Sequence, residues 1–149
     1  MDLENAVKYW VSESGYRKIQ SELSRRSHKG VSKYALENYI EHTNKETEKA
    51  REAADILQSE MKPSSMVKQF YRGMPSKITN THIREGFFSV TSDRKKAESY
   101  GEVYTVLVDK DVPRLNIHTE GGETLVAPGM VYRFRPTNIK NGHSLSARF

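Results

Sequence analysis

The sequence predicts an α+β fold in which the helices come first and the strands follow. Before Pro63, apolar residues recur at the spacing of an amphipathic helix, beginning with Leu3, Ala6, Val7 and Trp10. After Pro63 the apolar runs are short, and turn residues separate them, which is typical of strands. Helices grouped before strands favour an α+β fold over alternating βαβ units.

Four helical segments are expected before Pro63. Gly15 separates the first from the second, and Ser32 is placed to cap the third. Their apolar positions lie within residues 3–11, 16–23, 35–40 and 50–61.

Seven strands and one short helix are expected after Pro63. The helix should cover Ser92–Tyr100, with Ser92 or Asp93 as its cap and with Ala97 and Tyr100 facing inward. The strands are expected at Val67–Arg72, Gly86–Thr91, Val103–Val108, Arg114–Ile117, Thr124–Ala127, Val131–Arg135 and Ser144–Phe149. We therefore expect a single domain over residues 1–149, with a helical lobe at 1–62 and a β-rich core at 67–149.

Composition excludes some kinds of chemical site and indicates where in the cell the protein acts. The chain of 149 residues has no cysteine, which excludes disulfides, thiolate metal sites and a cysteine nucleophile. It has no apolar run long enough for a membrane span and no signal-peptide core, so we expect a cytoplasmic protein that uses neither a membrane nor Sec-type export. The net charge of +5 favours anionic partners, but the basic residues are scattered, so a nucleic acid is a weaker candidate than a dinucleotide or an acidic protein.

Two strand ends carry polar residues that can bind a ligand. Arg72 ends an apolar run and precedes Gly73, so its guanidinium can hold a phosphate where the backbone can approach a ligand. Ser89 and Thr91 are two residues apart and share one face of a strand. Taken locally, an arginine paired with a surface carboxylate and an ordinary edge-strand Ser/Thr pair explain these residues as well.

Glu123 follows a glycine-rich loop and opens an apolar stretch, so its carboxylate can face a ligand instead of the core. Taken alone, an exposed glutamate in a hairpin loop is the simpler interpretation. Glu120 and Glu123 could also form a glycosidase-type carboxylate pair, although the loop does not fix their geometry.

Other chemistries have less support in the sequence. The histidines lack metal-binding spacing, and no metal site is expected. No nucleophile elbow, dinucleotide-binding glycine fingerprint or P-loop is present.

The motifs occur in an order that resembles a known family. Tyr71-Arg72-Gly73, then Gly86-Phe87-Phe88-Ser89-Val90-Thr91, then the run from Glu123 to Gly129 resemble the mono-ADP-ribosyltransferases of the arginine–serine–glutamate class. That family includes bacterial toxins, phage enzymes and vertebrate ecto-enzymes. The resemblance implies a helical lobe packed on a split β-sandwich, with NAD as substrate in the cleft between the sheets.

The resemblance also implies a role for each matching residue. Arg72 would grip the NAD phosphates, with Gly73 and Thr91 beside the dinucleotide. Ser89 would hold the catalytic Glu123, which would bind the ribose 2′-hydroxyl and stabilise the positive charge that develops as nicotinamide leaves. Tyr100 is the candidate aromatic cover for nicotinamide.

The acceptor side departs from the family pattern. Enzymes that modify arginine carry a second glutamate two residues before the catalytic one, and here that position is Gly121, with Glu120 one residue away. A transferase acting on a macromolecule, most simply a host protein, is the leading hypothesis, and a phage or injected effector is the expected setting. The alternatives are an NAD glycohydrolase on the same fold and a non-catalytic binding module that uses a basic surface.

Overall fold

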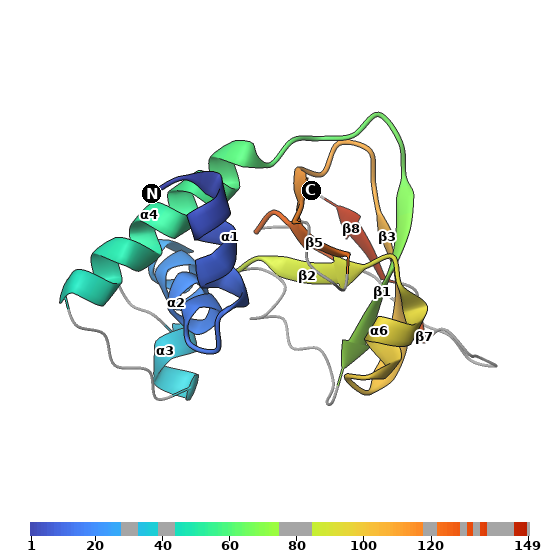
Figure 1. Ribbon diagram of the computed structural model, residues 1–149. Coiled ribbons are helices and arrows are strands. Elements are labelled where there is room, and N and C mark those ends of the chain that lie inside the picture. The colour runs from blue at the N-terminus through green and yellow to red at the C-terminus, as the bar shows by residue number, and fades with distance from the viewer. Residues whose placement is uncertain are drawn as a thin grey trace. The chain divides into compact units, whose positions relative to one another are not determined.

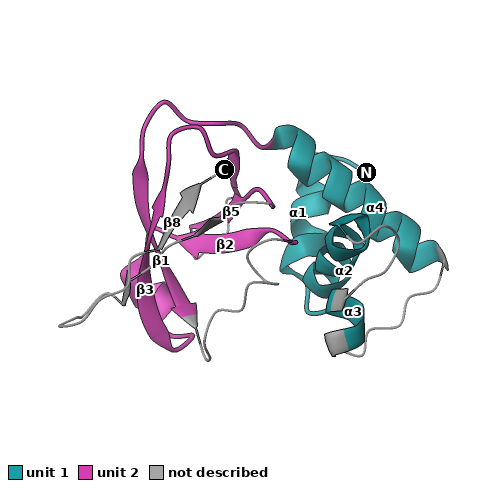
Figure 2. Ribbon diagram, turned by 180° about the vertical axis from the view of Figure 1, so that it is seen from behind, with its two compact units in different colours: residues 1–60 teal, residues 61–149 magenta. Residues whose placement is uncertain are grey.

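The chain forms two compact units, residues Met1–Glu60 and Met61–Phe149 (Figure 2). The structure is a computed structural model that describes residues 1–27, 33–38, 44–74, 85–117, 122–128, 131–132, 135–136 and 145–148. The division falls close to the change of pattern at Pro63. That the two units make one domain stays a prediction.

The first unit is helical, as the sequence predicts (Figure 1). Asp2 caps the first helix, because its carboxylate accepts a hydrogen bond of 2.8 Å from the Asn5 amide. Gly15 allows the second helix to begin close to the first, since a Cβ there would lie 1.7 Å from the Tyr9 carbonyl oxygen. The helices are α1 (Leu3–Val11), α2 (Gly15–Ser27), α3 (Lys33–Asn38) and α4 (Asn44–Glu60).

The core of this unit forms where α1 and α2 contact α4. Small side chains on α4 allow the neighbouring helices to approach closely, and larger ones fill the remaining space. The buried residues are Ala6, Trp10, Ile19, Leu23, Ala50, Ala53, Ala54 and Leu57. Within the described ranges, no helix is both long enough and apolar enough to cross a membrane.

A buried carboxylate in α2 is surrounded by arginines. The Glu22 side chain is 2% exposed, and Arg25 donates to it through Nε at 3.0 Å. Arg51 of α4 donates at 3.3 Å, and Arg26 Nε lies 3.7 Å from the same carboxylate. The fold tolerates the buried negative charge of Glu22 because several positive charges compensate it.

The second unit contains the strands. All seven predicted strands are found with small shifts at their ends, except that Val131–Arg135 contains two short strands, β6 and β7. The elements are β1 (Lys68–Met74), β2 (Phe88–Thr91), α6 (Arg94–Glu98), β3 (Glu102–Val108), β4 (Arg114–Asn116), β5 (Glu123–Val126), β6 (Val131–Tyr132), β7 (Arg135–Pro136) and β8 (Leu145–Arg148).

Within the described part of the chain, these strands form one eight-stranded sheet in the order β4-β5-β2-β1-β3-β8-β6, with β7 also paired to β3. The β3–β8 pair is parallel and the others are antiparallel. An antiparallel sheet preceded by helices confirms the predicted α+β class.

The sheet is weakly joined at its middle. β1 pairs with β3 along its whole length, and β2 pairs with β5 along its whole length. Between β1 and β2, however, only Tyr71 and Thr91 are register partners. The sheet therefore consists of two well-paired strand groups, β4-β5-β2 and β1-β3-β8-β6, that meet at one residue pair.

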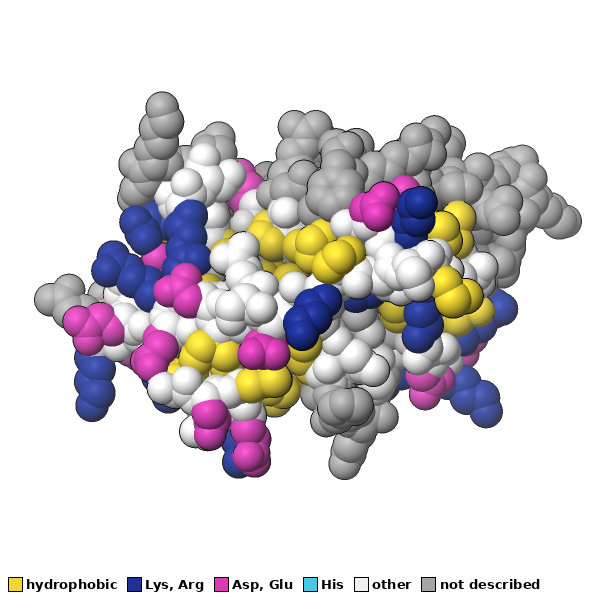
Figure 3. Space-filling model, turned by 90° about the horizontal axis from the view of Figure 1, so that it is seen from above, with side chains coloured by type: hydrophobic (Ala, Val, Ile, Leu, Met, Phe, Trp, Pro, Cys, Tyr) yellow, Lys and Arg dark blue, Asp and Glu magenta, His cyan; other side chains and the backbone are white. Residues whose placement is uncertain are grey.

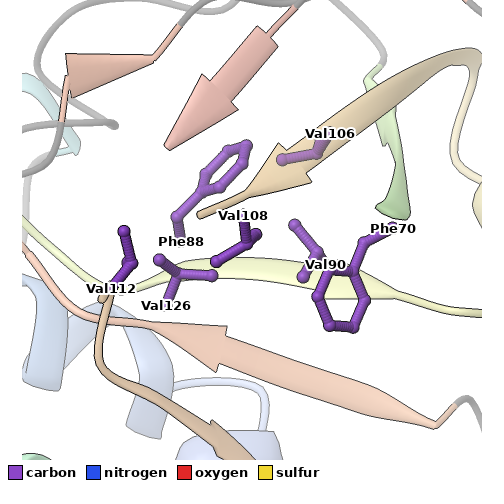
Figure 4. Close-up of a cluster of buried hydrophobic side chains, with 7 residues drawn as sticks. All are labelled: Phe70, Phe88, Val90, Val106, Val108, Val112 and Val126. Atoms are coloured by element: carbon purple, nitrogen blue, oxygen red, sulfur yellow. The ribbon is translucent and has the colours of Figure 1, made fainter. Parts of the chain in front are cut away.

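Apolar side chains from both strand groups form the core of this unit (Figure 4). Phe88 and Val90 come from β2, and each alternates with a polar residue on the other face of that strand. The full cluster is Phe70, Phe88, Val90, Val106, Val108, Val112 and Val126. The core holds the two groups together where their backbones are barely paired.

The helix α6 is shorter than the predicted Ser92–Tyr100. Asp93 caps it, accepting hydrogen bonds from the amides of Lys95 and Lys96. Ala97 is buried, as predicted, whereas Tyr100 follows the helix and is 58% exposed. The inward orientation predicted for Tyr100 is therefore wrong, because the helix ends before that residue.

Substituting a core residue of α4 tests the packing of the helical unit. Leu57→Ala should lower the free energy of unfolding by about 2–5 kcal/mol, because it removes a fully buried side chain. Urea unfolding followed by the fluorescence of Trp10, which lies in the same core, measures this loss. Leu36→Ala is the matched control, since Leu36 is 69% exposed and its loss should have little effect. Equal effects of the two substitutions would contradict this packing.

Candidate functional site

Ser89 and Glu123 meet on neighbouring strands of the sheet. Thr91 lies directly opposite Glu123 in the register of β2 and β5, and Ser89 is two residues from Thr91 on the same face. The Ser89 hydroxyl donates a short hydrogen bond to Oε1 of Glu123. The predicted pair is thus in contact, and one serine holds one oxygen of the carboxylate.

The β4–β5 hairpin fixes the position of Glu123. The Ile117 amide donates to the Glu123 carbonyl at 2.9 Å, so the backbone is held where β5 begins. Gly122 precedes it with a φ of +59°, a conformation that favours glycine. Glu123 is half-buried at the first position of β5, whereas Glu120 and Gly121 lie outside the described residues.

Arg72 lies where the two strand groups part. Its guanidinium donates to the Ser89 carbonyl at 2.7 Å and lies over the Phe88 ring, 5.2 Å from the centroid. Burial lowers the pKa of Arg72, while the charges of Glu123 and Tyr100 act in the opposite direction. An arginine keeps its positive charge under such conditions, so a cation and an anion both adjoin Ser89.

Gly73 brings β1 against α6. A Cβ at this position would lie 1.8 Å from the Ala97 carbonyl oxygen and 3.0 Å from Cβ of Tyr100. Glycine therefore allows β1 to approach α6 closely. This contact explains why a glycine is needed here, with no ligand involved. Contact between Gly73 and a dinucleotide stays a prediction.

Thr91 and Tyr100 border the same region. The Thr91 hydroxyl accepts a hydrogen bond of 3.0 Å from the Asp93 amide, which turns the chain from β2 into α6. Against the effect of burial, which lowers the pKa of Arg72, Tyr100 is close enough to raise that pKa, and Lys96 lies over the Tyr100 ring. Their proposed contacts with substrate are not tested by these interactions.

The arrangement suits the stabilisation of a positive charge beside a bound anion. A carboxylate oriented by a hydroxyl can face a developing cation, and a nearby guanidinium can hold a phosphate. Among the residues that the structure describes, no three His, Asp or Glu side chains gather in a way that could hold a metal ion.

Phe88 has a role in the site that the sequence did not indicate. The ring supports the Arg72 guanidinium because β1 and β2 diverge just past their single pair, and no local pattern in the sequence signals that divergence.

Adding a methyl group to Gly73 tests the contact between β1 and α6. Gly73→Ala should lower the free energy of unfolding by about 1–3 kcal/mol, because the added Cβ overlaps a backbone oxygen that cannot rotate away. Urea unfolding followed by far-ultraviolet circular dichroism measures the loss. Lys95→Ala, on the exposed side of the same helix, should change stability by less than about 0.5 kcal/mol. An unchanged stability of Gly73→Ala would show that α6 does not pack here.

Comparison with known proteins identifies the fold. No protein-family model matches the sequence, and a search of curated proteins gives no match either. Among solved structures, the chain is similar to Exoenzyme S from Pseudomonas aeruginosa, in a complex with human 14-3-3 protein beta and Carba-NAD. The TM-score is 0.52 at 13% identity, over 99% of this chain and 80% of that one.

A second similar structure is C3larvin toxin, an ADP-ribosyltransferase from Paenibacillus larvae, with a TM-score of 0.45 and 14% identity over 98% of this chain and 84% of that one. At such low identity, the similarity to Exoenzyme S establishes the fold alone. The chain therefore shares the fold of Exoenzyme S, which is consistent with the fold that the resemblance implies.

Proposed function

We propose that this chain is an NAD-dependent mono-ADP-ribosyltransferase. It cleaves the bond between nicotinamide and ribose and transfers ADP-ribose to a macromolecular acceptor, in the first instance a protein. The observation that carries the proposal is the contact between the Ser89 hydroxyl and the Glu123 carboxylate, with Arg72 bound to the same serine through its carbonyl. It stands on a fold shared with a protein solved with Carba-NAD.

Glu123 performs the central electrostatic task in this proposal. Nicotinamide leaves with the electron pair of the glycosidic bond, and positive charge develops on the ribose. A carboxylate fixed by Ser89 stabilises that charge without having to reorganise. The acceptor then forms a bond to the same ribose carbon and loses its proton to solvent or to a nearby base.

Arg72 binds the phosphates of NAD in this proposal. A guanidinium has several N–H donors, so its bond to the Ser89 carbonyl is compatible with a bond to a phosphate oxygen. The weak pairing of β1 and β2 supports a split β-sandwich in which the dinucleotide lies where the strand groups part. Tyr100 and Thr91 border that region and complete the proposed contacts.

The acceptor and the compartment belong to the same proposal. Exoenzyme S was solved together with a 14-3-3 protein, and a protein acceptor is in keeping with that association. The proposed setting is the cytoplasm of the producer or of an infected or intoxicated cell. On the face seen in Figure 3, acidic and basic side chains are intermixed, which favours a protein over a nucleic acid as the acceptor.

A second candidate function is NAD hydrolysis on the same fold. It is favoured by Gly121, which stands where arginine-modifying relatives of this class carry a glutamate. Without that carboxylate, water can take the place of a protein acceptor. A non-catalytic binding module is the third candidate, and measurement of nicotinamide release by the unaltered protein tests it.

Removing the charge of Glu123 tests the catalytic assignment. Glu123→Gln should reduce nicotinamide release from NAD by on the order of 100-fold or more, because the amide cannot stabilise the developing positive charge. Nicotinamide is measured by chromatography, and thermal unfolding checks that the variant still folds. Glu98→Gln is the matched control, since Glu98 is an exposed glutamate of α6 that pairs only with Arg94 among the contacts described. Full activity of Glu123→Gln would remove it from the mechanism, and no activity of the unaltered protein would favour the binding module.

The fate of ADP-ribose separates transfer from hydrolysis. With NAD labelled in the adenosine moiety and a cell lysate, a transferase should place the label on a macromolecule, whereas a glycohydrolase should release free ADP-ribose alone. Gel electrophoresis and thin-layer chromatography measure the two products. Digestion by protease or nuclease then identifies the labelled acceptor as protein or nucleic acid. Label confined to free ADP-ribose would contradict the transferase proposal and support hydrolysis.

A further inference from the structure

The helical unit has a pocket that is open to solvent and is not part of the site described above; it is called the cavity below. It measures about 570 Å³ and lies between α1, the turn after α1, and α4. A volume of this size is within the range of small-molecule sites, and it exceeds what a single inorganic ion fills. The side chains that matter for its chemistry are Asn5, Lys8, Tyr9, Ser12, Ser14 and Lys49.

The hydroxyl of Tyr9 is buried without a hydrogen-bond partner. Among the described residues, it is the one buried side-chain oxygen or nitrogen in this condition. A polar atom removed from water without a partner destabilises the fold, so such atoms usually mark the place of a ligand or ordered water. Burial raises the pKa of Tyr9, with the negative charge of Glu46 acting in the same direction, so the phenol stays protonated and can donate.

The lining of the cavity is cationic and hydroxylated. Lys8 and Lys49 contribute ammonium groups, and no carboxylate lines the cavity among the described residues. Lys8 is paired with the exposed Glu4 at 3.3 Å, whereas Lys49 lies over the Tyr9 ring, 4.8 Å from its centroid, with no carboxylate within ion-pair distance in the described ranges. The ammonium of Lys49 therefore lies on the Tyr9 ring, is exposed to solvent and is available to an anion.

Together with burial, the negative charge of Glu46 acts on the Tyr9 phenol and raises its pKa. Glu46 forms an ion pair of 2.6 Å with Lys18. The Ser12 hydroxyl is also committed, since it donates to the Tyr9 carbonyl at 2.7 Å and accepts from the Gly15 amide. The lining residues that remain as candidate donors are thus Lys49, Tyr9 and the exposed Ser14.

We propose that this cavity binds the phosphate group of a small polar phosphate monoester. A phosphate has several oxygens that accept strong hydrogen bonds from an ammonium and from hydroxyls, so it can use Lys49, Tyr9 and Ser14 together. The remaining volume takes the organic part of the ester. Every residue involved belongs to the helical unit, so the site is independent of Arg72, Ser89 and Glu123 and does not rest on the proposed function.

Calorimetric titration of the full chain with ribose 5-phosphate tests whether the charge of Lys49 contributes to binding. Lys49→Gln should weaken binding by about tenfold or more, because a hydrogen bond to a charged donor is lost. Lys45→Gln is the matched control, since Lys45 is an exposed lysine of α4 outside the cavity, and it should leave the affinity unchanged. Ribose alone should not bind, and inorganic phosphate should bind more weakly than the ester. Equal binding of inorganic phosphate would overturn the assignment to an ester.

Tyr9→Phe separates a binding role from a structural one. Because the hydroxyl has no partner in the free protein, its removal should leave the melting temperature equal or higher. The same variant should weaken binding of ribose 5-phosphate by about fivefold or more, through loss of a donor. A large fall in melting temperature, with unchanged affinity, would show that the hydroxyl is satisfied within the fold and would overturn the proposal.

A last pair of variants locates the bound phosphate. Glu123→Gln and Arg72→Lys should retain the affinity for ribose 5-phosphate. If Arg72→Lys abolished binding while Lys49→Gln did not, the phosphate would sit in the β-rich unit and the cavity would not be its site. Loss of ribose 5-phosphate binding can be distinguished from loss of NAD cleavage, because NAD cleavage is measured in a separate assay without the phosphate ester.

Discussion

The hydrogen bond from the Arg72 guanidinium to the Ser89 carbonyl is the constraint on which the β-rich unit depends. β1 and β2 pair at one residue only, so the carbonyl beyond that pair needs a donor that is not a neighbouring strand amide. A long, always charged side chain supplies it and lies on the Phe88 ring. The same bond sets the backbone of Ser89, whose hydroxyl then holds Glu123. A half-buried cation at this point therefore couples the junction of the strand groups to the geometry of the candidate site.

Arginines also stabilise the helical unit, but there the charge at the centre is negative. There the buried charge is the carboxylate of Glu22, and arginines from α2 and α4 surround it. In the β-rich unit the charge at the centre is the half-buried guanidinium of Arg72, and a backbone carbonyl and a carboxylate adjoin it. The physical requirement is the same in both units, because a charge can leave water only where fixed partners replace the lost hydration.

Local patterns in the sequence predicted most of the elements, because helix and strand periodicities are properties of neighbouring residues. They also brought Ser89 and Thr91 to one face, since alternation along a strand needs no tertiary information. What they could not predict depends on register between distant segments. The contact of Arg72 with Phe88, the packing of Gly73 on Ala97 and the buried hydroxyl of Tyr9 all arise where separate elements meet. Glu120 and Gly121 lie outside the described residues.

The position of Glu123 separates bond cleavage from the choice of acceptor in the proposed reaction. Its backbone is fixed by Ile117 across the hairpin and its side chain by Ser89 on the next strand. Neither contact involves residues 118–121, so in the proposed reaction a substitution among them removes neither of these two supports of the carboxylate. Gly121 is one of these residues, and a residue without a side chain contributes no group to an acceptor. In the proposed reaction the carboxylate is thus held by Ser89 and by the backbone contact with Ile117, whereas the choice of acceptor depends on other residues.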